Sequence, residues 1–307
     1  MRTIANRAKE VETMNTTNPI KRVGVLAALH KPNIEMALQR VLRVLDAWGV
    51  QVMLPTECAE FIRRPTAATH PDDIATADLI LALGGDGCVL SAARMTAQHN
   101  TAILGVRVGG FGFLSEVDWH NVEEALTLIQ DGKHSIEKRW LVEALVQRDG
   151  QPIWMAYALN DVVVTHSASP RLHMFEVRVN GEMLLEVFAD GIIVATPTGS
   201  TAYSLSAGGP IVLPDANVFL ITPVCAHVLY ARPVVTSADA VVSVRVPPTK
   251  MGDVDATVMV DGQVNLRLLP EDEVLVKTST HYAHLVRLGK FQFLERLRQK
   301  LKWGYRD

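Results

Sequence analysis

The tetrapeptide Gly-Gly-Asp-Gly at residues 84–87 places a carboxylate inside a glycine-rich turn. It follows the apolar stretch Ala77–Leu83, which is typical of a buried parallel strand, and precedes a helical pattern over Val89–Ala97. Glycines allow backbone amides to approach phosphate oxygens, and the N-terminus of a helix attracts anions. In such a turn, Asp86 could take a proton from an attacking hydroxyl or help to hold a divalent ion. A tight turn with Asp86 as a helix cap fits the four residues equally well.

A second stretch rich in hydrogen-bonding groups runs from Thr196 to Pro210 and reads TPTGSTAYSLSAGGP. Its hydroxyls and glycines surround one tyrosine, Tyr203, whose ring could stack against a base. A polar connecting loop is the alternative, but the stretch carries no charge and follows strand-like residues 191–195. Two shorter pairs, Asn160-Asp161 and Asp190-Gly191, each precede an apolar strand pattern and by themselves indicate turns.

Two halves with different patterns must position these residues. From Lys21 onward, apolar strands alternate with helical spacing at 34–45 and 122–130, which predicts an α/β domain with a Rossmann-like parallel sheet. Past about residue 140, alternating runs are separated by Asp-Gly or Asn-Gly pairs, which favour hairpin turns and predict an all-β antiparallel domain. Helical spacing returns near the end of the chain, and we expect this C-terminal helix to pack back on the first domain.

The predicted organisation follows from these changes of pattern. Its parts are a flexible N-terminal tail (1–20), an α/β domain with the GGDG motif (21–145), an antiparallel β domain that binds the ligand (146–285) and a C-terminal segment (286–307).

Composition excludes some classes of partner. The 307 residues carry a net charge of −3 and no long basic run, which argues against nucleic acid. No apolar stretch reaches the roughly 20 residues that span a bilayer, so we expect no membrane association. The three cysteines (Cys58, Cys88 and Cys225) lack metal-binding spacing, and the first residues lack a signal-peptide core. These features predict a cytoplasmic protein.

Taken together, the motifs resemble the NAD kinase family. GGDG alone is shared with phosphofructokinases and with diacylglycerol and sphingosine kinases, whereas the stretch from Asp190 to Pro210 is similar to the NAD kinase signature almost residue for residue. Further similar segments are Ile103–Leu114 with its GFGFL ending, residues 158–161, Pro223–His227, Arg232-Pro233, Asp261-Gly262-Gln263 and residues 301–304. The resemblance covers roughly residues 21–304.

The resemblance implies phosphoryl transfer from ATP or another donor to the 2′-hydroxyl of the adenosine ribose of NAD, with Mg²⁺ or Mn²⁺. It implies that Asp86 is the catalytic carboxylate and a candidate metal ligand, and that Gly84, Gly85 and Gly87 lie near the phosphates. The NAD-binding residues that it implies are Phe113, Asn160, Asp161, Arg171, Asp190, Thr201, Ala202, Tyr203, Ser206 and Gln263. Because the family's counterpart of Asp190 can reach a neighbouring subunit's site, we expect a homodimer or homotetramer.

Three residues depart from the usual family pattern. Cys88 stands where Thr is most common, Arg107 replaces an Asn, and Asp161 replaces the commoner Glu. Arg107 could contact a donor phosphate in place of the lost hydroxyl, or it could be a solvated surface charge. Two alternatives to an active NAD kinase remain: a weakly catalytic NAD(P)-binding regulator on the same fold, and a lipid or sugar kinase that shares GGDG. The intact Asp86 favours the active enzyme, and the long signature disfavours the lipid or sugar kinase.

Overall fold

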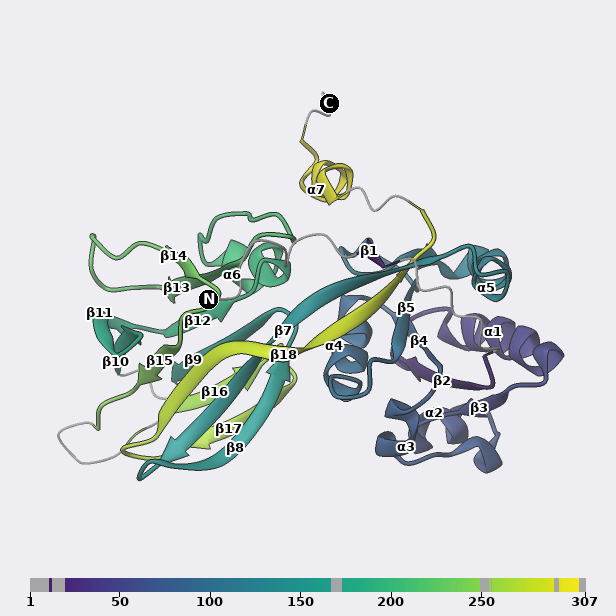
Figure 1. The fold of residues 1–307 in the computed structure, drawn as a ribbon, viewed down its shortest axis with the longest axis horizontal. Coiled ribbons are helices and arrows are strands. Elements are labelled where there is room, and N and C mark those ends of the chain that lie inside the picture. The colour runs from purple at the N-terminus through teal and green to yellow at the C-terminus, as the bar shows by residue number, and fades with distance from the viewer. Residues whose placement is uncertain are drawn as a thin grey trace. The chain divides into compact units, whose positions relative to one another are not determined.

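The chain forms two units that differ in secondary structure (Figure 1). The computed structural model describes residues 11–12, 20–166, 173–248, 254, 256–289 and 293–303. One unit, here called the α/β unit, extends to Arg139 and resumes at Tyr282, and the other, the β unit, comprises Trp140–His281. The β unit is therefore an insertion in the sequence of the α/β unit.

The α/β unit alternates strands and helices. Its elements are β1 (Val11–Glu12), β2 (Arg22–Ala27), α1 (Ile34–Trp48), β3 (Gln51–Met53), α2 (Thr56–Phe61), the 3-10 turn η1 (Pro65–Ala67), α3 (Pro71–Ala75), β4 (Leu79–Gly84), α4 (Asp86–Met95), β5 (Ala102–Arg107), β6 (Val117–Asp118), η2 (Trp119–Asn121), α5 (Val122–Gln130) and α7 (Phe293–Leu301). Two long strands, β7 (Ser135–Arg148) and β18 (Glu273–Arg287), each belong partly to one unit and partly to the other.

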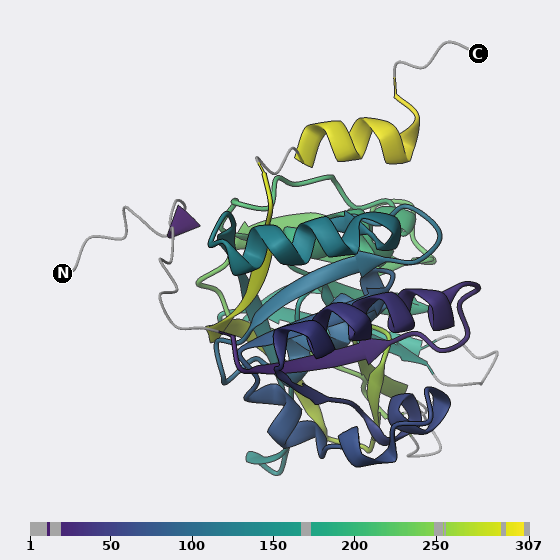
Figure 2. The ribbon, with the colours of Figure 1, turned by 90° about the vertical axis from the view of Figure 1, so that its right-hand side faces the viewer.

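The sheet of the α/β unit is parallel, with the strand order β3-β2-β4-β5, as the apolar runs predict. Along β2, Val23 and Val25 belong to the core that also contains residues of α1 and α5, whereas Gly24 lies against Ile74 of α3. Helices thus cover both faces of the sheet, and Figure 2 shows α1 and α5 on the same side. Helix α1 ends at Gly49, whose φ of 68° suits a helix C-cap, as predicted.

The turn after β4 and the loop after β5 leave the same edge of this sheet. Gly84 at the end of β4 pairs with Arg107 at the end of β5. Open α/β sheets bind ligands at this carboxyl edge. Helix α4 begins at Asp86, earlier than the predicted Val89, because Gly85 with an extended φ of −135° already serves as its N-cap.

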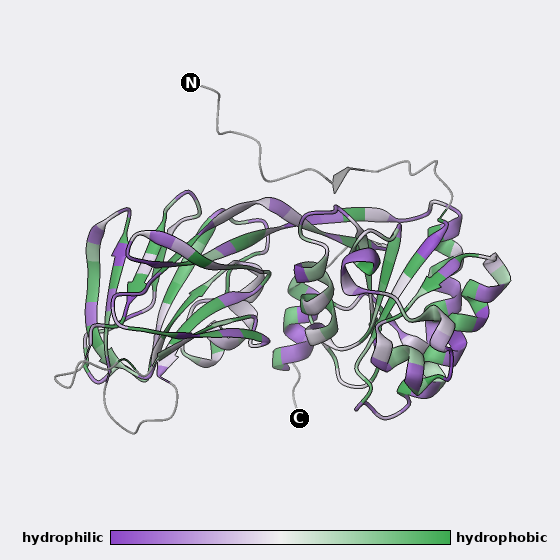
Figure 3. Ribbon diagram, turned by 90° about the horizontal axis from the view of Figure 1, so that it is seen from below, coloured by the Kyte–Doolittle hydropathy of each residue, from purple (hydrophilic) through white to green (hydrophobic). Residues whose placement is uncertain are grey.

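The β unit is built from antiparallel strands. Its remaining elements are β8 (Gln151–Ala158), β9 (Asp161–His166), β10 (His173–Val179), β11 (Glu182–Ala189), β12 (Gly191–Ala195), η3 (Thr198–Thr201), α6 (Tyr203–Ser206), β13 (Val218–Val224), β14 (Val234–Ser237), β15 (Val242–Arg245), β16 (Ala256–Val260) and β17 (Val264–Leu268). One sheet has the order β14-β13-β12-β9-β16-β17, and β11, β10, β15 and β18 form a second antiparallel layer. Hydrophobic and hydrophilic residues alternate along many of these strands (Figure 3).

The predicted hairpin turns of the β unit are confirmed. The pairs Asp149-Gly150, Asn180-Gly181 and Asp261-Gly262 all have positive φ angles, between 50° and 83°. They join β7 to β8, β10 to β11 and β16 to β17. The sequence patterns did not predict β8, β13, β14 and β17. Strand β13 shows why: it is buried on both faces and therefore does not alternate.

In the sequence, both boundaries between the units fall inside strands, between residues 139 and 140 in β7 and between residues 281 and 282 in β18. The sequence patterns predicted the boundaries at 145/146 and 285/286. Because both strands continue through the transition, no change of pattern marks it. In the predicted tail, Val11 and Glu12 form β1 against β7, whose edge leaves backbone groups to be paired. Apart from Ile20, the rest of that tail lies outside the described residues.

Helix α7 belongs to the α/β unit, which confirms the predicted return of the C-terminal segment. The ring of Phe293 in α7 lies 6.3 Å from the ring of Phe113 in the loop after β5. None of the helices in the described part of the chain is both long and apolar enough to cross a membrane.

Candidate functional site

Asp86 directs both carboxylate oxygens at the loop that follows β5. Oδ2 accepts a hydrogen bond from the backbone N–H of Phe113 at 2.8 Å, and Oδ1 accepts one from Leu114 at 3.0 Å. The carboxylate thus joins the start of α4 to the β5 loop, which a simple helix cap does not do. Each oxygen keeps a second lone pair that could accept a proton from a bound hydroxyl.

Glycines set how closely the chain approaches this carboxylate. A Cβ added to Gly112 would lie 2.2 Å from Asp86 Oδ1, so only glycine lets the loop reach the carboxylate. Gly84 has a φ of 157°, and a Cβ there would lie 2.7 Å from the Cys88 sulfur. Gly85 has no neighbour within 4 Å of such a Cβ, which leaves open space beside the turn.

The two departures near this turn both have protein partners. Arg107 donates from Nε and Nη2 to Asp118 Oδ2, each at 3.2 Å, and its guanidinium lies 5.4 Å from the centre of the Phe111 ring. It is therefore an ion-paired side chain, not the freely solvated charge that was one alternative. Cys88 donates from Sγ to the carbonyl oxygen of Leu83 at 3.3 Å, and burial raises the pKa of its thiol.

In the β unit, the Asp261 carboxylate holds the Asn160-Asp161 pair by its backbone. Oδ1 accepts from the N–H of Asn160 at 2.8 Å and of Asp161 at 3.2 Å, and Oδ2 accepts from Leu159 at 3.0 Å. In return, the N–H of Asp261 donates to the carbonyl oxygen of Asp161 at 3.0 Å. Asp261 therefore does more than form the predicted hairpin turn.

The Asp161 carboxylate has the opposite environment. Only 4% of the residue is exposed, and within the described part of the chain no group donates a hydrogen bond to the carboxylate. Burial, followed by the like charge of Asp261, raises the pKa of Asp161 to about 7. A buried carboxyl without a hydrogen-bond partner is costly in a folded protein unless a ligand supplies that partner.

The hydroxyls of the Thr196–Pro210 stretch fall into two sets. Thr196, Ser200 and Ser204 are buried and hold the fold: for example, Thr196 donates to the carbonyl oxygen of Leu159 at 2.6 Å, and Ser204 lies 3.0 Å from the Thr222 hydroxyl. Three residues implied for NAD binding point outward or are partly exposed, namely Thr201, Tyr203 and Ser206, with 44% of Tyr203 accessible. Of these three, Thr201 donates from Oγ1 to the carbonyl oxygen of Thr198 at 3.4 Å, whereas Tyr203 and Ser206 are the exposed members of the predicted site.

Gly199 in this stretch packs directly on the Asn160 backbone. An added Cβ would lie 2.1 Å from the Asn160 carbonyl oxygen. That same oxygen accepts a hydrogen bond from Thr196 N at 2.8 Å. The structure therefore brings the Thr196–Pro210 stretch and the Asn160-Asp161 pair together, as the resemblance requires.

Asp190 and Tyr203 lie in a shared electrostatic environment. Burial raises the pKa of Tyr203, and the neighbouring Cys225, Asp190 and Asp161 raise it further. Asp190 lies 3.6 Å from Nε2 of His166, and its backbone oxygen accepts from Thr165 Oγ1 at 2.8 Å. The charge of Asp190 thus acts on the same region as that of Asp161.

The remaining predicted residues divide as follows. Gln263 is exposed in the β16–β17 turn, Ala202 is half-buried between η3 and α6, and Arg171 lies outside the described residues. Sequence reasoning missed the roles of Gly112, Gly199 and the Asp261 carboxylate. Each residue stands in a recognised motif, but its contact is with a segment far away in the chain.

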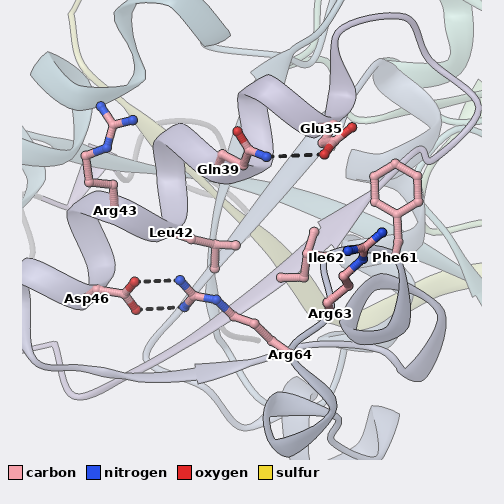
Figure 4. Close-up of a pocket in the computed structure, with 9 residues that line it drawn as sticks. All are labelled: Glu35, Gln39, Leu42, Arg43, Asp46, Phe61, Ile62, Arg63 and Arg64. Atoms are coloured by element: carbon pink, nitrogen blue, oxygen red, sulfur yellow. Dashed lines mark hydrogen bonds and ion pairs between the residues drawn. The ribbon is translucent and has the colours of Figure 1, made fainter.

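A surface pocket elsewhere in the α/β unit has a volume of about 750 Å³ and lies between α1 and the end of α2 (Figure 4). Its lining residues are Glu35, Gln39, Leu42, Arg43, Asp46, Phe61, Ile62, Arg63 and Arg64. Arg64 is paired with Asp46 by two hydrogen bonds of 2.7 and 2.8 Å, and Glu35 accepts from Gln39. No predicted site residue lines this pocket, so we do not assign it to the site.

Among the residues that the structure describes, no group of three or more His, Cys, Asp or Glu side chains could hold a metal ion. A Mg²⁺ site can be built with fewer protein ligands. In such a site, the ion is bound by one or two carboxylates, and water and substrate phosphates complete its coordination shell. Asp86 fits the protein's part in a site of that kind.

Comparisons with known proteins agree with this geometry. The family model for the ATP-NAD kinase N-terminal domain matches residues 14–134, and that for the C-terminal domain matches residues 159–288. The NAD kinase of Thermoanaerobacter sp. (strain X514) is 41% identical over 92% of this chain and 99% of its own length. That of Citrifermentans bemidjiense is 35% identical over 94% of this chain and 100% of its own.

Solved structures show the same fold. Yeast NADH kinase complexed with NADH matches with a TM-score of 0.87 and 25% identity over 95% of this chain and 90% of that one. An NAD kinase from Archaeoglobus fulgidus in complex with ATP has a TM-score of 0.70 at 24% identity, over 92% of this chain and 97% of that one. The matched family models and the relatives at 35% identity or more cover nearly all of the chain. The chain belongs to the NAD kinase family.

Proposed function

We propose that this protein is an active NAD kinase that transfers a phosphoryl group from ATP to the 2′-hydroxyl of the adenosine ribose of NAD, giving NADP. The observation that carries the proposal is the Asp86 carboxylate, which two backbone amides fix in one orientation while a lone pair on each oxygen stays available. Relatives named NAD kinase, and solved relatives that contain NADH or ATP, support the substrates.

In this mechanism, Asp86 is the general base. The 2′-hydroxyl attacks the terminal phosphorus of ATP, Asp86 accepts the hydroxyl proton, and ADP leaves. A hydroxyl oxygen placed within hydrogen-bonding distance of the carboxylate is already aligned for attack, so positioning supplies much of the rate. No covalent enzyme intermediate is needed for phosphoryl transfer of this kind.

The other groups of the turn serve the donor. We place the donor phosphates beside Gly84, Gly85 and Gly87, because the space beside Gly85 is open and α4 begins there. Asp86 is the residue that would help to hold a divalent ion, Mg²⁺ or Mn²⁺, and the ion would supply positive charge that neutralises the transferred phosphoryl group. The Arg107–Asp118 pair would have to open before Arg107 could reach a phosphate.

We assign the NAD-binding role in the β unit to Asn160, Asp161, Thr201, Ala202, Tyr203 and Ser206, with Asp190, Gln263 and Arg171 as further members and Phe113 from the α/β unit. Their support is the family resemblance, together with the exposure of Tyr203 and the unpartnered Asp161 carboxylate. The Asp161 side chain is expected to receive from NAD the hydrogen-bonding partner that the protein does not supply.

We further propose a cytoplasmic homo-oligomer, either a dimer or a tetramer. The free cysteines Cys58, Cys88 and Cys225 suit a reducing compartment. The side chain of Asp190 is 45% exposed, which leaves it able to reach a ligand held by a second copy. Light scattering that gave a monomer with undiminished activity would remove Asp190 from a shared site.

The test of the proposed function is NADP formation by the purified protein with ATP, other nucleotides and polyphosphate as donors. We expect Asp86→Asn to reduce kcat by roughly 10²–10⁴-fold, as for loss of a general base, with the dissociation constant of NAD nearly unchanged. Full activity of Asp86→Asn would refute the assigned base, and absence of NADP formation by the unchanged protein with every donor would refute the proposed function.

A further inference from the structure

In the loop that binds Asp86, both the N–H and the carbonyl oxygen of the same peptide group form hydrogen bonds. The N–H of Leu114 donates to Asp86 Oδ1 at 3.0 Å. The carbonyl oxygen of the same peptide group, that of Phe113, accepts from Nη1 of Arg296 in α7 at 3.3 Å. One peptide group therefore stands between the guanidinium and the carboxylate. Hydrogen bonds linked through a peptide in this way polarise one another, so a cation on the oxygen strengthens the N–H as a donor.

The next carbonyl groups of the loop are bound by cations from the same C-terminal segment. Nη1 of Arg296 also donates to the carbonyl oxygen of Ser115, and Nη1 of Arg287 donates to that of Leu114 at 3.3 Å. Lys300 Nζ donates to the carbonyl oxygen of Phe111. The amides of the loop thus face Asp86 while its carbonyl oxygens face Arg287 and α7, which leaves the loop peptides little freedom to rotate.

Glu116 fixes the Arg296 side chain in this position. Its carboxylate accepts from Arg296 Nη2 at 3.1 Å and from Arg287 Nη1 at 3.0 Å, and Oε1 accepts from the N–H of Leu288 at 3.1 Å. The Glu116 and Arg287 side chains are only 10% and 3% exposed. Partly buried, multiply bonded ion pairs of this kind hold their geometry far better than exposed surface pairs.

Asp86 and Arg296 are also close enough to influence each other's charge. Burial, and after it the charge of Arg287, lowers the pKa of Arg296, whereas the charges of Glu116 and Asp86 act in the opposite direction. The guanidinium stays protonated at any pH at which the protein folds, because an arginine side chain does not lose its proton in that range.

We propose that Arg296 of α7 is a positioning residue for Asp86: it holds the Phe113–Leu114 peptide so that both loop amides point at the carboxylate. This inference rests on the proposed role of Asp86 as the general base. Without the Arg296 guanidinium, the loop peptides can rotate and the Asp86 carboxylate loses its fixed orientation. The distance from this carboxylate to the attacking hydroxyl then varies. Arg296 itself need not touch NAD or the donor.

The test uses the full-length enzyme with three variants of α7. Arg296→Gln removes the charge and part of the fork, Arg296→Lys keeps the charge, and Arg298→Gln is a matched control at an exposed position of the same helix. We expect Arg296→Gln to lower kcat by roughly tenfold to a hundredfold, the loss typical of a catalytic group displaced by about 1 Å. The KM for NAD should change by less than about twofold, since no ground-state contact is lost. Arg296→Lys should recover part of kcat, and Arg298→Gln should match the unchanged enzyme.

A second measurement separates positioning from a general loss of structure. Selective ¹⁵N labelling of Phe and Leu reports the amides of Phe113 and Leu114. Their resonances should move in Arg296→Gln and in Asp86→Asn, but not in Arg298→Gln. Unmoved amide resonances in Arg296→Gln, or a kcat loss matched by Arg298→Gln, would overturn the proposal.

A double-mutant cycle decides whether the two residues act together. In the Asp86→Asn background, Arg296→Gln should lower the residual kcat by less than about twofold, because the group that it positions is already lost. An equal loss in both backgrounds would mean that Arg296 acts independently, and the proposal would be wrong while the role of Asp86 stood. Full activity of Asp86→Asn would instead reject the proposed base, whatever Arg296 does.

Discussion

The two units use the same device for different ends. In each, one aspartate carboxylate accepts hydrogen bonds from consecutive backbone amides of a distant loop: Asp86 from Phe113 and Leu114, and Asp261 from Leu159, Asn160 and Asp161. In each, a glycine is required for close approach to one of the groups concerned, Gly112 at Asp86 and Gly199 at Asn160. In the α/β unit, however, the bound carboxylate is the one proposed to react.

In the β unit, the carboxylate held by amides lies beside the group proposed to contact NAD. Asp261 is satisfied by the amides, and its charge helps to raise the pKa of Asp161 to about 7, after the larger effect of burial. The comparison shows two uses of backbone amides. In the α/β unit, the amides orient the Asp86 carboxylate for reaction. In the β unit, they fix the charge of Asp261, and among the described residues the neighbouring Asp161 carboxyl has no hydrogen-bond partner until a ligand binds. The variants below separate these two uses through kcat and KM.

The largest effect is expected for Gly112→Ala, which forces a Cβ to within 2.2 Å of Asp86 Oδ1. Displacing the carboxylate should lower kcat by roughly 10²-fold, with little change in the KM for NAD. Gly110→Ala is the matched control in the same loop, because a Cβ there has no neighbour within 4 Å. Steady-state kinetics of both variants checks this. Equal kcat values for the two would mean that the loop yields without moving Asp86.

The next largest effect is expected for Asp261→Asn. An asparagine presents an NH₂ group where Oδ2 accepts from Leu159, so one buried amide faces a donor. Loss of the acceptor for the Leu159 N–H costs about 1–3 kcal/mol. If most of this free energy is lost from the complex with NAD, we expect the KM for NAD to rise by about 30-fold. Asp215→Asn makes the same charge change at an exposed position of the β unit and should leave KM unchanged. A loss confined to kcat would contradict the comparison.

A smaller change in kcat is expected for Gly199→Ala, because its Cβ would meet the backbone carbonyl oxygen of Asn160 at 2.1 Å, in the segment proposed to bind NAD and not at the carboxylate proposed to react. Overpacking of this kind typically costs about 1–3 kcal/mol, and we expect about a tenfold rise in the KM for NAD. The kcat should fall much less than in Gly112→Ala. Kinetics of the two alanine variants side by side gives the readout, and identical kcat-to-KM patterns would remove the distinction between the units.

The last effect is expected in the free energy of unfolding, as a dependence on pH. Asp161 titrates near pH 7 in the folded protein and near 4 when unfolded, so the folded state binds the extra proton between these values. Stability should therefore fall as pH rises from about 4 to about 7 and then level off, by about 2 kcal/mol between pH 5 and 7. Asp161→Asn should lack this slope. Urea unfolding from pH 5 to 8 measures it, and equal slopes in both proteins would show that Asp161 does not carry the proton.

Local chemistry made much of the fold predictable. Gly49 ends α1, and the Asp-Gly and Asn-Gly pairs form the turns of the hairpins, because each depends on a residue that tolerates positive φ. The GGDG turn could be placed after β4 because it directly follows the apolar run Ala77–Leu83. The start of α4 at Asp86 was less predictable, since it depends on the extended conformation of Gly85.

The roles of particular side chains in the candidate site were less accessible to sequence reasoning. The amides that Asp261 holds precede it by 100 to 102 residues, and no periodicity links the two segments. The motif containing Asp261 predicts a turn, and that turn is present, but its carboxylate has a second task. Arg107 illustrates the reverse: the sequence shows its charge, but not that Asp118 is its ion-pair partner.

The insertion of the β unit within the α/β unit determines when, during synthesis, the Asp86 loop can be completed. Ser115 and Arg296 are 181 residues apart in the chain. Contacts with so large a separation form late, because the intervening chain must first be brought to closure. On the ribosome, Arg287 and α7 emerge only after the whole of Trp140–His281 has been made. A nascent chain can therefore form the GGDG turn early, but it gains the cations that hold the loop only after the inserted unit has left the exit tunnel.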